Sequence, residues 1–130
     1  MVGKRRVLLV EDDPEHAQLI RDCLALDGSF IVDWVDYAHL IWDALDNNTY
    51  HIVLLDYRLP DGNGLDVLDE INDRCYQIPV VMVTAQGDEQ VAAQSVQRGA
   101  ADYVVKKIDL FSELYFLWAN TMKILLLKAR

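Results

Sequence analysis

The sequence predicts a doubly wound α/β fold, in which five parallel strands form one sheet that helices cover on both faces. Apolar runs of strand length alternate five times with helical patterns along the chain. These runs are almost wholly apolar, as in parallel strands buried on both faces, and they lack the polar alternation of a half-exposed antiparallel sheet. Most of the runs close with a polar residue, which marks the carboxyl end of the strand.

The first half of the chain supplies three strands and two helices. The strands are expected at residues 6–10, 30–35 and 51–55, and the third of them closes with Asp56. Asp13 before Pro14 is a good helix start, because aspartate caps helices and proline at the first helical position loses no needed hydrogen bond. The apolar stripes of the two helices are Ala17, Ile20, Cys23 and Leu24, and then Ala38, Ile41, Ala44 and Leu45.

The second half of the chain begins with a loop over residues 57–64 that is dense in turn residues. A third helix follows the loop and directs Leu65, Leu68 and Ile71 to the core. The remaining elements are a strand at 80–83 that closes with Thr84, a helix at 88–98, a short strand at 103–105 that closes with Lys106, and a long helix at 110–127.

Right-handed crossovers between such strands give the flavodoxin-like strand order 2-1-3-4-5. The winding reverses between strands one and three, and open α/β sheets bind ligands at the carboxyl ends of the strands at such a point. Glu11, Asp12 and Asp13 follow the first strand, and Asp56 closes the third. The sequence therefore predicts a carboxylate cluster in this crevice, with the hydroxyl of the fourth strand and the ammonium of the fifth beside it.

Composition excludes several classes of protein. A chain of 130 residues that is 52% hydrophobic forms one sizeable core, and its formal net charge of −9 argues against binding of nucleic acid. No uninterrupted apolar stretch is long enough for membrane insertion. The apolar run near the start is too short for a signal peptide, which predicts a cytoplasmic protein. Cys23 and Cys75 have no metal-ligand spacing, and no disulfide between them is expected.

Carboxylates gathered in one crevice repel one another, so the cluster needs a cation or shared protons. Ligation by oxygen alone suits a hard ion such as Mg²⁺, and no strand ends in a His or Cys that would favour zinc or copper. The alternative is that these acids only cap helices. That alternative stays open for Asp13, whereas Asp56 precedes no helix.

A carboxylate beside Mg²⁺ can attack a phosphoryl group and form an acyl phosphate. Such a transfer depends mainly on charge neutralisation and in-line positioning. Lys106 would bring a compact positive charge to the phosphoryl oxygens, and Thr84 would bring a hydroxyl donor. Each residue also has a structural explanation, because threonine favours strands and lysine often ends one.

Taken together, these motifs resemble the receiver domain of bacterial two-component response regulators over nearly the whole chain, residues 1–130. The resemblance rests on four segments in this order and spacing: Val7–Pro14, Leu54–Asp56 with Leu59, Pro60 and Gly64, Val83–Ala85, and Gly99–Lys106. It implies a signalling switch in a phosphorelay, charged by a histidine kinase or phosphotransfer protein. It also implies that the chain is no enzyme beyond autocatalysed phosphoryl transfer and self-dephosphorylation.

The resemblance further implies a role for each residue of the crevice. Asp56 would be the phosphoacceptor. The Mg²⁺ ligands would be Asp12, Asp56, the backbone carbonyl of Arg58 and, through water, Glu11. The phosphoryl group would be contacted by Thr84 and Lys106, and Tyr103 would be the switch aromatic. The change would be read by a protein partner on the surface of the fourth helix, fifth strand and fifth helix.

The chain departs from the family pattern after the lysine, where most receivers have a proline in a cis bond and this chain has Lys107. A cis bond before another residue costs about 3–4 kcal/mol, which favours a trans bond here and leaves open a different placement or timing of Lys106.

Arg58 and Gln86 would flank the incoming water. We expect these two residues to tune how long the phosphoryl group lasts.

The last helix is apolar nearly all round over residues 110–127, whereas a core-facing stripe needs only three or four apolar residues per two turns. The excess apolar surface predicts docking onto a partner or self-association, with a homodimer through this helix as one form. A wide stripe over a small core is the alternative explanation.

Other functions fit the crevice less well. Because 130 residues leave no room for an output domain, we expect a single-domain regulator or a receiver cut from a longer protein, such as a hybrid kinase. A Mg²⁺-dependent aspartyl-phosphate phosphatase needs a second acid two residues after its nucleophile, where Arg58 stands. A flavin protein needs a Ser/Thr/Gly-rich loop that cradles phosphate after the first strand, and this chain lacks such a loop there. A pseudo-receiver would lack part of the acidic set, Thr84 or Lys106, all of which are present.

Overall fold

The computed structural model describes residues 4–25, 28–85, 88–106, 124 and 126–128. Its long strands are β1 (Arg5–Val10), β2 (Phe30–Val35), β3 (Ile52–Asp56), β6 (Val80–Ala85) and β7 (Asp102–Lys106). Its helices are α1 (Pro14–Ala25), the 3-10 helix η1 (Ala38–Leu40), α2 (Ile41–Asn47), α3 (Gly64–Asp73) and α4 (Glu89–Gln97). Two short strands, β4 (Arg58–Leu59) and β5 (Gly62–Asn63), form a separate antiparallel ribbon.

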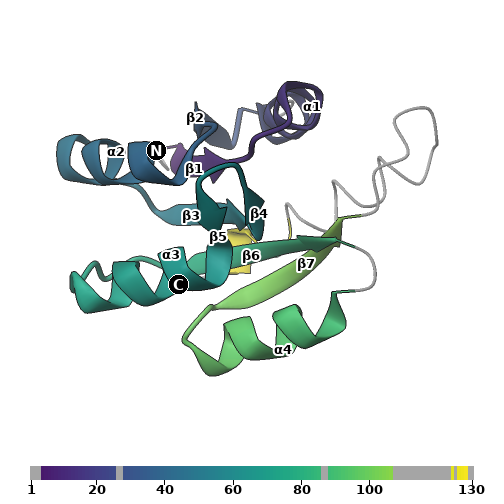
Figure 1. The fold of residues 1–130 in the computed structure, drawn as a ribbon. Helices are drawn as coiled ribbons and strands as arrows, with labels where there is room; N and C mark the ends of the chain where they lie inside the picture. Colours follow the sequence, from purple (N-terminus) through teal and green to yellow (C-terminus); the bar gives the residue numbers. More distant parts are fainter. Residues whose placement is uncertain (1–3, 26–27, 86–87, 107–123, 125, 129–130) are drawn as a thin grey trace.

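The long strands form one five-stranded sheet in the order β2-β1-β3-β6-β7, and every neighbouring pair is parallel. This is the predicted order 2-1-3-4-5, with the labels shifted because the ribbon strands are also numbered. Figure 1 shows helices on both sides of the sheet. The predicted doubly wound fold is therefore confirmed, and the predicted strands agree with the observed ones within two residues at each end.

Alternate residues of each strand face opposite sides of the sheet and build two apolar cores. In β1, Val7 and Leu9 belong to the core that includes α1, whereas Leu8 and Val10 belong to the core that includes α2 and α3. Every residue of β3 is buried, up to and including Asp56. Burial on both faces explains why these strands are continuously apolar in sequence.

The loop after β3 contains structure that the sequence did not signal, namely the β4–β5 ribbon. Each of its strands has two residues, which is too short for any hydrophobic period to be read. The ribbon leads into α3 at Gly64, where an added Cβ would lie 2.8 Å from the Asp56 carbonyl oxygen and 2.8 Å from Met82 Sδ. A glycine therefore lets α3 begin directly against the end of β3.

Helices α3 and α4 end in the same way, with a residue in the left-handed region just beyond the helix. After α4 this residue is Gly99, with φ of 99°, and after α3 it is Cys75, with φ of 62°. After α4, the backbone N–H groups of Gly99 and Ala100 donate to carbonyls in the last turn of the helix. After α3, the backbone N–H groups of Cys75 and Tyr76 do the same. Only the end of α3 places a side chain in a conformation that favours glycine.

The predicted last helix, residues 110–127, lies almost wholly outside the described residues. Within it, Leu126 is buried in the core on the α1 side, whereas Ile124 and Leu127 are about half exposed. Among the helices that the structure describes, none has the length and apolar character that crossing a membrane requires.

Candidate carboxylate site

Three carboxylates meet at the carboxyl ends of β1 and β3. One oxygen from each of Glu11, Asp12 and Asp56 can be chosen so that all three lie within 4.8 Å of one another. The two strands are adjacent, and Val10 pairs with Leu55, so the residues that follow them reach the same level of the sheet. The structure thus brings together three of the four acids that the topology placed at the switch point.

The cluster is partly buried. Glu11 is 1% exposed and Asp56 is 8% exposed, whereas Asp12 is exposed. A Glu11 oxygen accepts a hydrogen bond from the Asp12 backbone N–H at 3.1 Å, and Asp56 Oδ1 accepts one from the Arg58 backbone N–H at 3.4 Å. Burying carboxylates beside one another is unfavourable unless charge is supplied from elsewhere.

Asp13 does not belong to this trio. Its Oδ1 accepts hydrogen bonds from the backbone N–H groups of Glu15 at 2.9 Å and His16 at 3.3 Å. These are the contacts of a helix cap at the start of α1. The open alternative for Asp13 is thereby decided in favour of capping.

Two contacts of the acidic loop were not foreseen from the sequence. The Trp34 indole Nε1 donates to the Glu11 carbonyl at 2.7 Å, and His16 Nδ1 lies 3.4 Å from a Glu11 carboxylate oxygen. Signals for both existed, because Trp34 lies on the strand next to β1 and His16 lies in the first turn after the loop. Both residues hold Glu11 in place behind the exposed Asp12.

Thr84 lies on β6, one residue beyond Val83, the register partner of Asp56. The threonine is fully buried, and its Oγ1 has no hydrogen-bond partner in the described part of the chain. A buried hydroxyl without an acceptor is costly and uncommon. This donor is therefore available for a ligand at the same end of the sheet.

Lys106 ends β7 in register with Ala85. Its side chain is not among those described, and Gln86 and Lys107 lie outside the described residues. The predicted phosphoryl contact of Lys106, the role of Gln86 and the geometry of the bond before Lys107 therefore remain predictions.

Tyr103 and Arg58 both lie at the surface. Tyr103 lies on β7 and is 40% exposed. The Arg58 guanidinium is 3.3 Å from Asp88 Oδ2, just before α4. The Arg58 side chain thus spans from the loop after β3 to the loop before α4.

The trio fits a small hard cation. Mg²⁺ holds oxygen ligands at about 2.0–2.1 Å, so ligands on opposite sides of the ion are about 4.2 Å apart. Oxygens that lie within 4.8 Å of one another need only small adjustments to meet this span. The residues that would hold such an ion are Asp12 and Asp56 directly, with Glu11 behind them.

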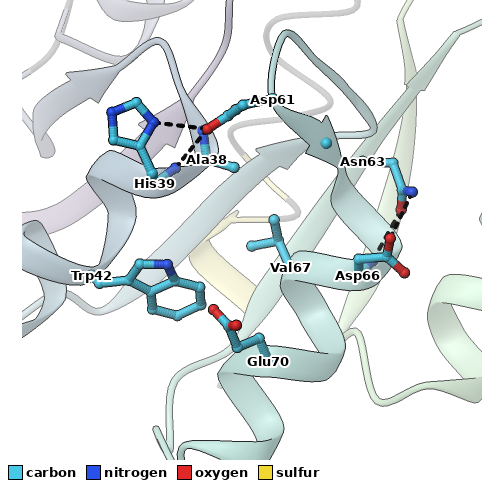
Figure 2. A pocket seen from close by; sticks show the side chains of 9 residues that line it. Ala38, His39, Trp42, Asp61, Asn63, Asp66, Val67 and Glu70 are labelled. Carbon is cyan, nitrogen blue, oxygen red and sulfur yellow. Dashed lines mark hydrogen bonds and ion pairs between the residues drawn. The ribbon is translucent and has the colours of Figure 1, made fainter.

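A separate hollow of about 270 Å³ lies between α2, α3 and the ribbon, and no residue of the trio lines it. Figure 2 shows Asp61 at its rim, hydrogen-bonded to the backbone N–H of Ala38 at 2.7 Å and to the His39 ring at 2.8 Å. Burial raises the pKa of Asp61, but the hydrogen bonds from the His39 ring and from the backbone N–H groups of Ala38 and His39 outweigh it and lower the pKa to about 2. Asp61 thus ties the ribbon to the start of α2.

Comparison with known proteins finds a family that this chain matches. Residues 7–114 match the family model of the response regulator receiver domain. The chain is 32% identical over 103 residues to the response regulator RppA of Synechocystis, and 35% identical over 109 residues to the transcriptional activator protein IrlR of Burkholderia pseudomallei. The matches cover 78% and 84% of this chain but only 44% and 46% of those proteins. The chain therefore spans less than half the length of these relatives.

Solved structures agree on the fold. The crystal structure of the phosphorylated cyanobacterial phytochrome response regulator RcpA superimposes with a TM-score of 0.84, covering 97% of this chain and 96% of that one. The two sequences are 24% identical, so this likeness supports the shared fold alone.

Proposed function

The chain belongs to the response regulator receiver domain family of two-component systems, and on that premise we propose that it is a phosphorylatable switch with Asp56 as phosphoacceptor. The observation that carries the proposal is the convergence of Glu11, Asp12 and Asp56 at the end of β1 and β3. The fully buried Thr84 hydroxyl, with no acceptor among the described residues, supports it independently. One site would thus offer a nucleophile, cation ligands and a donor.

In the proposed transfer, a carboxylate oxygen of Asp56 forms the new P–O bond. The N–P bond of a phosphohistidine on the donor breaks, and the departing imidazole nitrogen keeps the electron pair and takes a proton. Bound Mg²⁺ supplies positive charge that offsets the repulsion between the carboxylate and the phosphoryl oxygens. Asp12, Asp56 and the backbone carbonyl of Arg58 would hold the ion, and Glu11 would act through water.

The residues around the phosphoryl group would then convert its charge into a change of shape. Thr84 would donate its hydroxyl hydrogen to a phosphoryl oxygen, and Lys106 would pair with another. Movement of Thr84 would open space for the ring of Tyr103, which is exposed here. A gap of a few kcal/mol between the two states is small enough for such contacts to shift the population.

The proposed partners are a histidine kinase or phosphotransfer protein that charges Asp56, and a protein that reads the surface of α4, β7 and the last helix. A homodimer through residues 110–127 is a further proposal, based on their apolar sequence. The names of the relatives include a transcriptional activator, but the chain spans less than half of that protein. We propose a cytoplasmic place of action and one receiver domain over residues 1–130.

The test is incubation with Mg²⁺ and a small-molecule phosphodonor, followed by intact-mass measurement. We expect a gain of one phosphoryl group that resists acid, is lost in base and vanishes in Asp56→Asn. Asp61→Asn is the matched control, because Asp61 lies in the same loop but outside the trio. A mass gain that persists in Asp56→Asn, or that never occurs in the unaltered protein, rules the proposal out.

A further inference from the structure

The start of α4 is unlike the starts of α1 and α3. Asn63 before α3 has extended φ and ψ of −132° and 157°, and its side chain accepts the Asp66 backbone N–H. Asp13 caps α1 in the same manner. Asp88 occupies the cap position of α4 but has φ and ψ of −98° and 43° and makes no side-chain cap hydrogen bond. A residue type that caps well therefore does not cap here.

The Asp88 carboxylate instead pairs with Arg58, whose Nη2 lies 3.3 Å from Asp88 Oδ2. Arg58 follows the proposed phosphoacceptor by two residues, and its backbone N–H already donates to Asp56 Oδ1. One side chain thus joins the loop that would receive the phosphoryl group to the residue just before α4. No other described ion pair links these two loops.

The ion pair between Arg58 and Asp88 can be exchanged for a stronger one. The Arg58 side chain is 72% exposed and that of Asp88 is 21% exposed, and water and salt screen an ion pair whose cation lies at the surface. A phosphoryl group on Asp56 would bring a charge of about −1.5 to −2 and oxygens that match a guanidinium bidentately. Such a group is a stronger partner for Arg58 than a single carboxylate.

We propose that Arg58 exchanges partners on phosphorylation, leaving Asp88 for the phosphoryl oxygens, and that the released Asp88 then caps α4. The new acceptor contact would be made to the backbone N–H of Gln90 or Val91, the second and third residues of the helix. This inference rests on the proposed function of Asp56. Asp88 is thus a positioning residue that holds Arg58 before phosphorylation. After phosphorylation, α4 receives the signal through its own first turn.

The unphosphorylated protein gives the first test, by hydrogen exchange at the Gln90 and Val91 amides. Asp88→Asn keeps a capping side chain but loses the charge that holds Arg58, and Arg58→Gln releases Asp88 directly. Both variants are expected to protect these amides roughly fivefold better than the unaltered chain, as a gained cap requires. Asp88→Ala should show no gain, and Glu89→Gln is the control in the same turn. Equal exchange in the unaltered chain, Asp88→Asn and Arg58→Gln overturns the exchange of partners.

The phosphorylated protein gives the second test, with Mg²⁺ and a small phosphodonor, following mass and amide resonances together. We expect the Gln90 and Val91 resonances to move on phosphorylation toward their positions in unphosphorylated Arg58→Gln. Asp88→Asn should change the phosphoryl lifetime roughly two- to fivefold, the scale of a weak ion pair, and should have no such effect in an Arg58→Gln background.

The outcomes separate this inference from the function on which it rests. A mass gain with unmoved Gln90 and Val91 resonances overturns the exchange and leaves Asp56 as the phosphoacceptor. A lifetime that responds to Asp88→Asn equally with and without Arg58 also overturns it, because Asp88 would then act by another route. Failure to gain phosphoryl mass overturns both proposals.

Discussion

The sheet carries carboxylates in two places, toward its amino ends and at its carboxyl ends, and in the described part of the chain the two are held by different contacts. Near the start of β1, Asp33 Oδ2 accepts hydrogen bonds from Arg6 Nη2 at 2.8 Å, Arg6 Nε at 3.1 Å and the Tyr50 hydroxyl at 2.7 Å. At the other end, Glu11, Asp12 and Asp56 share one small space. Three groups of like charge are gathered there.

The amino-end network stabilises the ionised form of its acid. Burial raises the pKa of Asp33, but the hydrogen bonds from Tyr50 and Arg6 and the charge of Arg6 outweigh it and lower the pKa below its usual value. Burial and the bond to Asp33 raise the pKa of Tyr50 to about 12. Asp33 thus has Arg6 as its cation, whereas carboxylates gathered at one site repel one another at a cost in stability.

The largest expected effect is on the packing behind the carboxyl-end site. Gly64→Ala places a methyl group 2.8 Å from the Asp56 carbonyl and from Met82 Sδ, and overpacking of this kind costs about 1–3 kcal/mol of unfolding free energy. Denaturant unfolding measures this loss. Gly62→Ala is the control, since nothing lies within 4 Å of its added Cβ. A Gly64→Ala protein as stable as Gly62→Ala would show that α3 does not pack against Asp56 as described.

The next effect compares the two charge centres directly. The same Asp→Asn substitution should lower the free energy of unfolding at the amino-end centre and leave it unchanged or raise it at the carboxyl-end centre. Asp33→Asn breaks charge-assisted hydrogen bonds and should lower the free energy of unfolding by about 1–2 kcal/mol. Asp56→Asn removes one of three like charges and should leave stability unchanged or raise it by up to about 1 kcal/mol in the absence of divalent ions. Unfolding in a chelator measures both, and a loss of similar size in the two variants would erase the distinction.

Tyr50→Phe tests the amino-end network through pH. The pKa of Tyr50 is raised from 10.0 to about 12, so its contribution is complete below pH 10 and is lost as pH rises through 12. The pKa of Asp33 is lowered, so its contribution is present above 3.8 and is lost as pH falls below that value. We expect Tyr50→Phe to be about 1 kcal/mol less stable at neutral pH.

The difference between Tyr50→Phe and the unaltered chain should therefore stay constant from neutral pH to 10 and shrink above it. Unfolding curves at stepped pH follow this difference. Growth of the difference above pH 10 would contradict the assigned hydrogen bond.

The smallest expected effect lies at the far end of α3, outside both charge centres. Cys75→Gly relieves a side chain at φ of 62° and should raise the free energy of unfolding by about 0.5–1 kcal/mol. Phosphoryl incorporation should not change, which makes this variant the reference for a stability change unrelated to charge. Lower stability in Cys75→Gly would mean that the thiol packing outweighs the backbone strain.

Much of the fold was predictable because the central strands β3 and β6 are buried on both faces. Continuous apolar runs such as residues 52–55 have no other simple explanation, and their order along the chain, with right-handed crossovers, determines the sheet. The strand ends placed Glu11, Asp12 and Asp56 together, along with Asp13, which caps α1 instead. The order of strands and helices determines which residues lie at the same edge of the sheet, and this order can be inferred from a single sequence.

Other features depend on side-chain direction, which periodicity does not encode. The bond from Trp34 to the Glu11 carbonyl joins residues on adjacent strands, and the pairing of Arg58 with Asp88 joins two loops. The diversion of Asp88 from its cap ran against the local preference of the residue, because a distant partner competes for it. The β4–β5 ribbon was missed because two residues per strand give no pattern.

The most direct test of the central claim is calorimetric titration with Mg²⁺ of the unaltered chain, Asp12→Asn and Asp33→Asn. If the carboxyl-end trio is a cation site, the unaltered chain and Asp33→Asn bind one ion each, and Asp12→Asn binds it at least tenfold more weakly, on the order of one lost charged ligand. Absence of binding in the unaltered chain, or binding that survives Asp12→Asn and is lost in Asp33→Asn, would contradict the account.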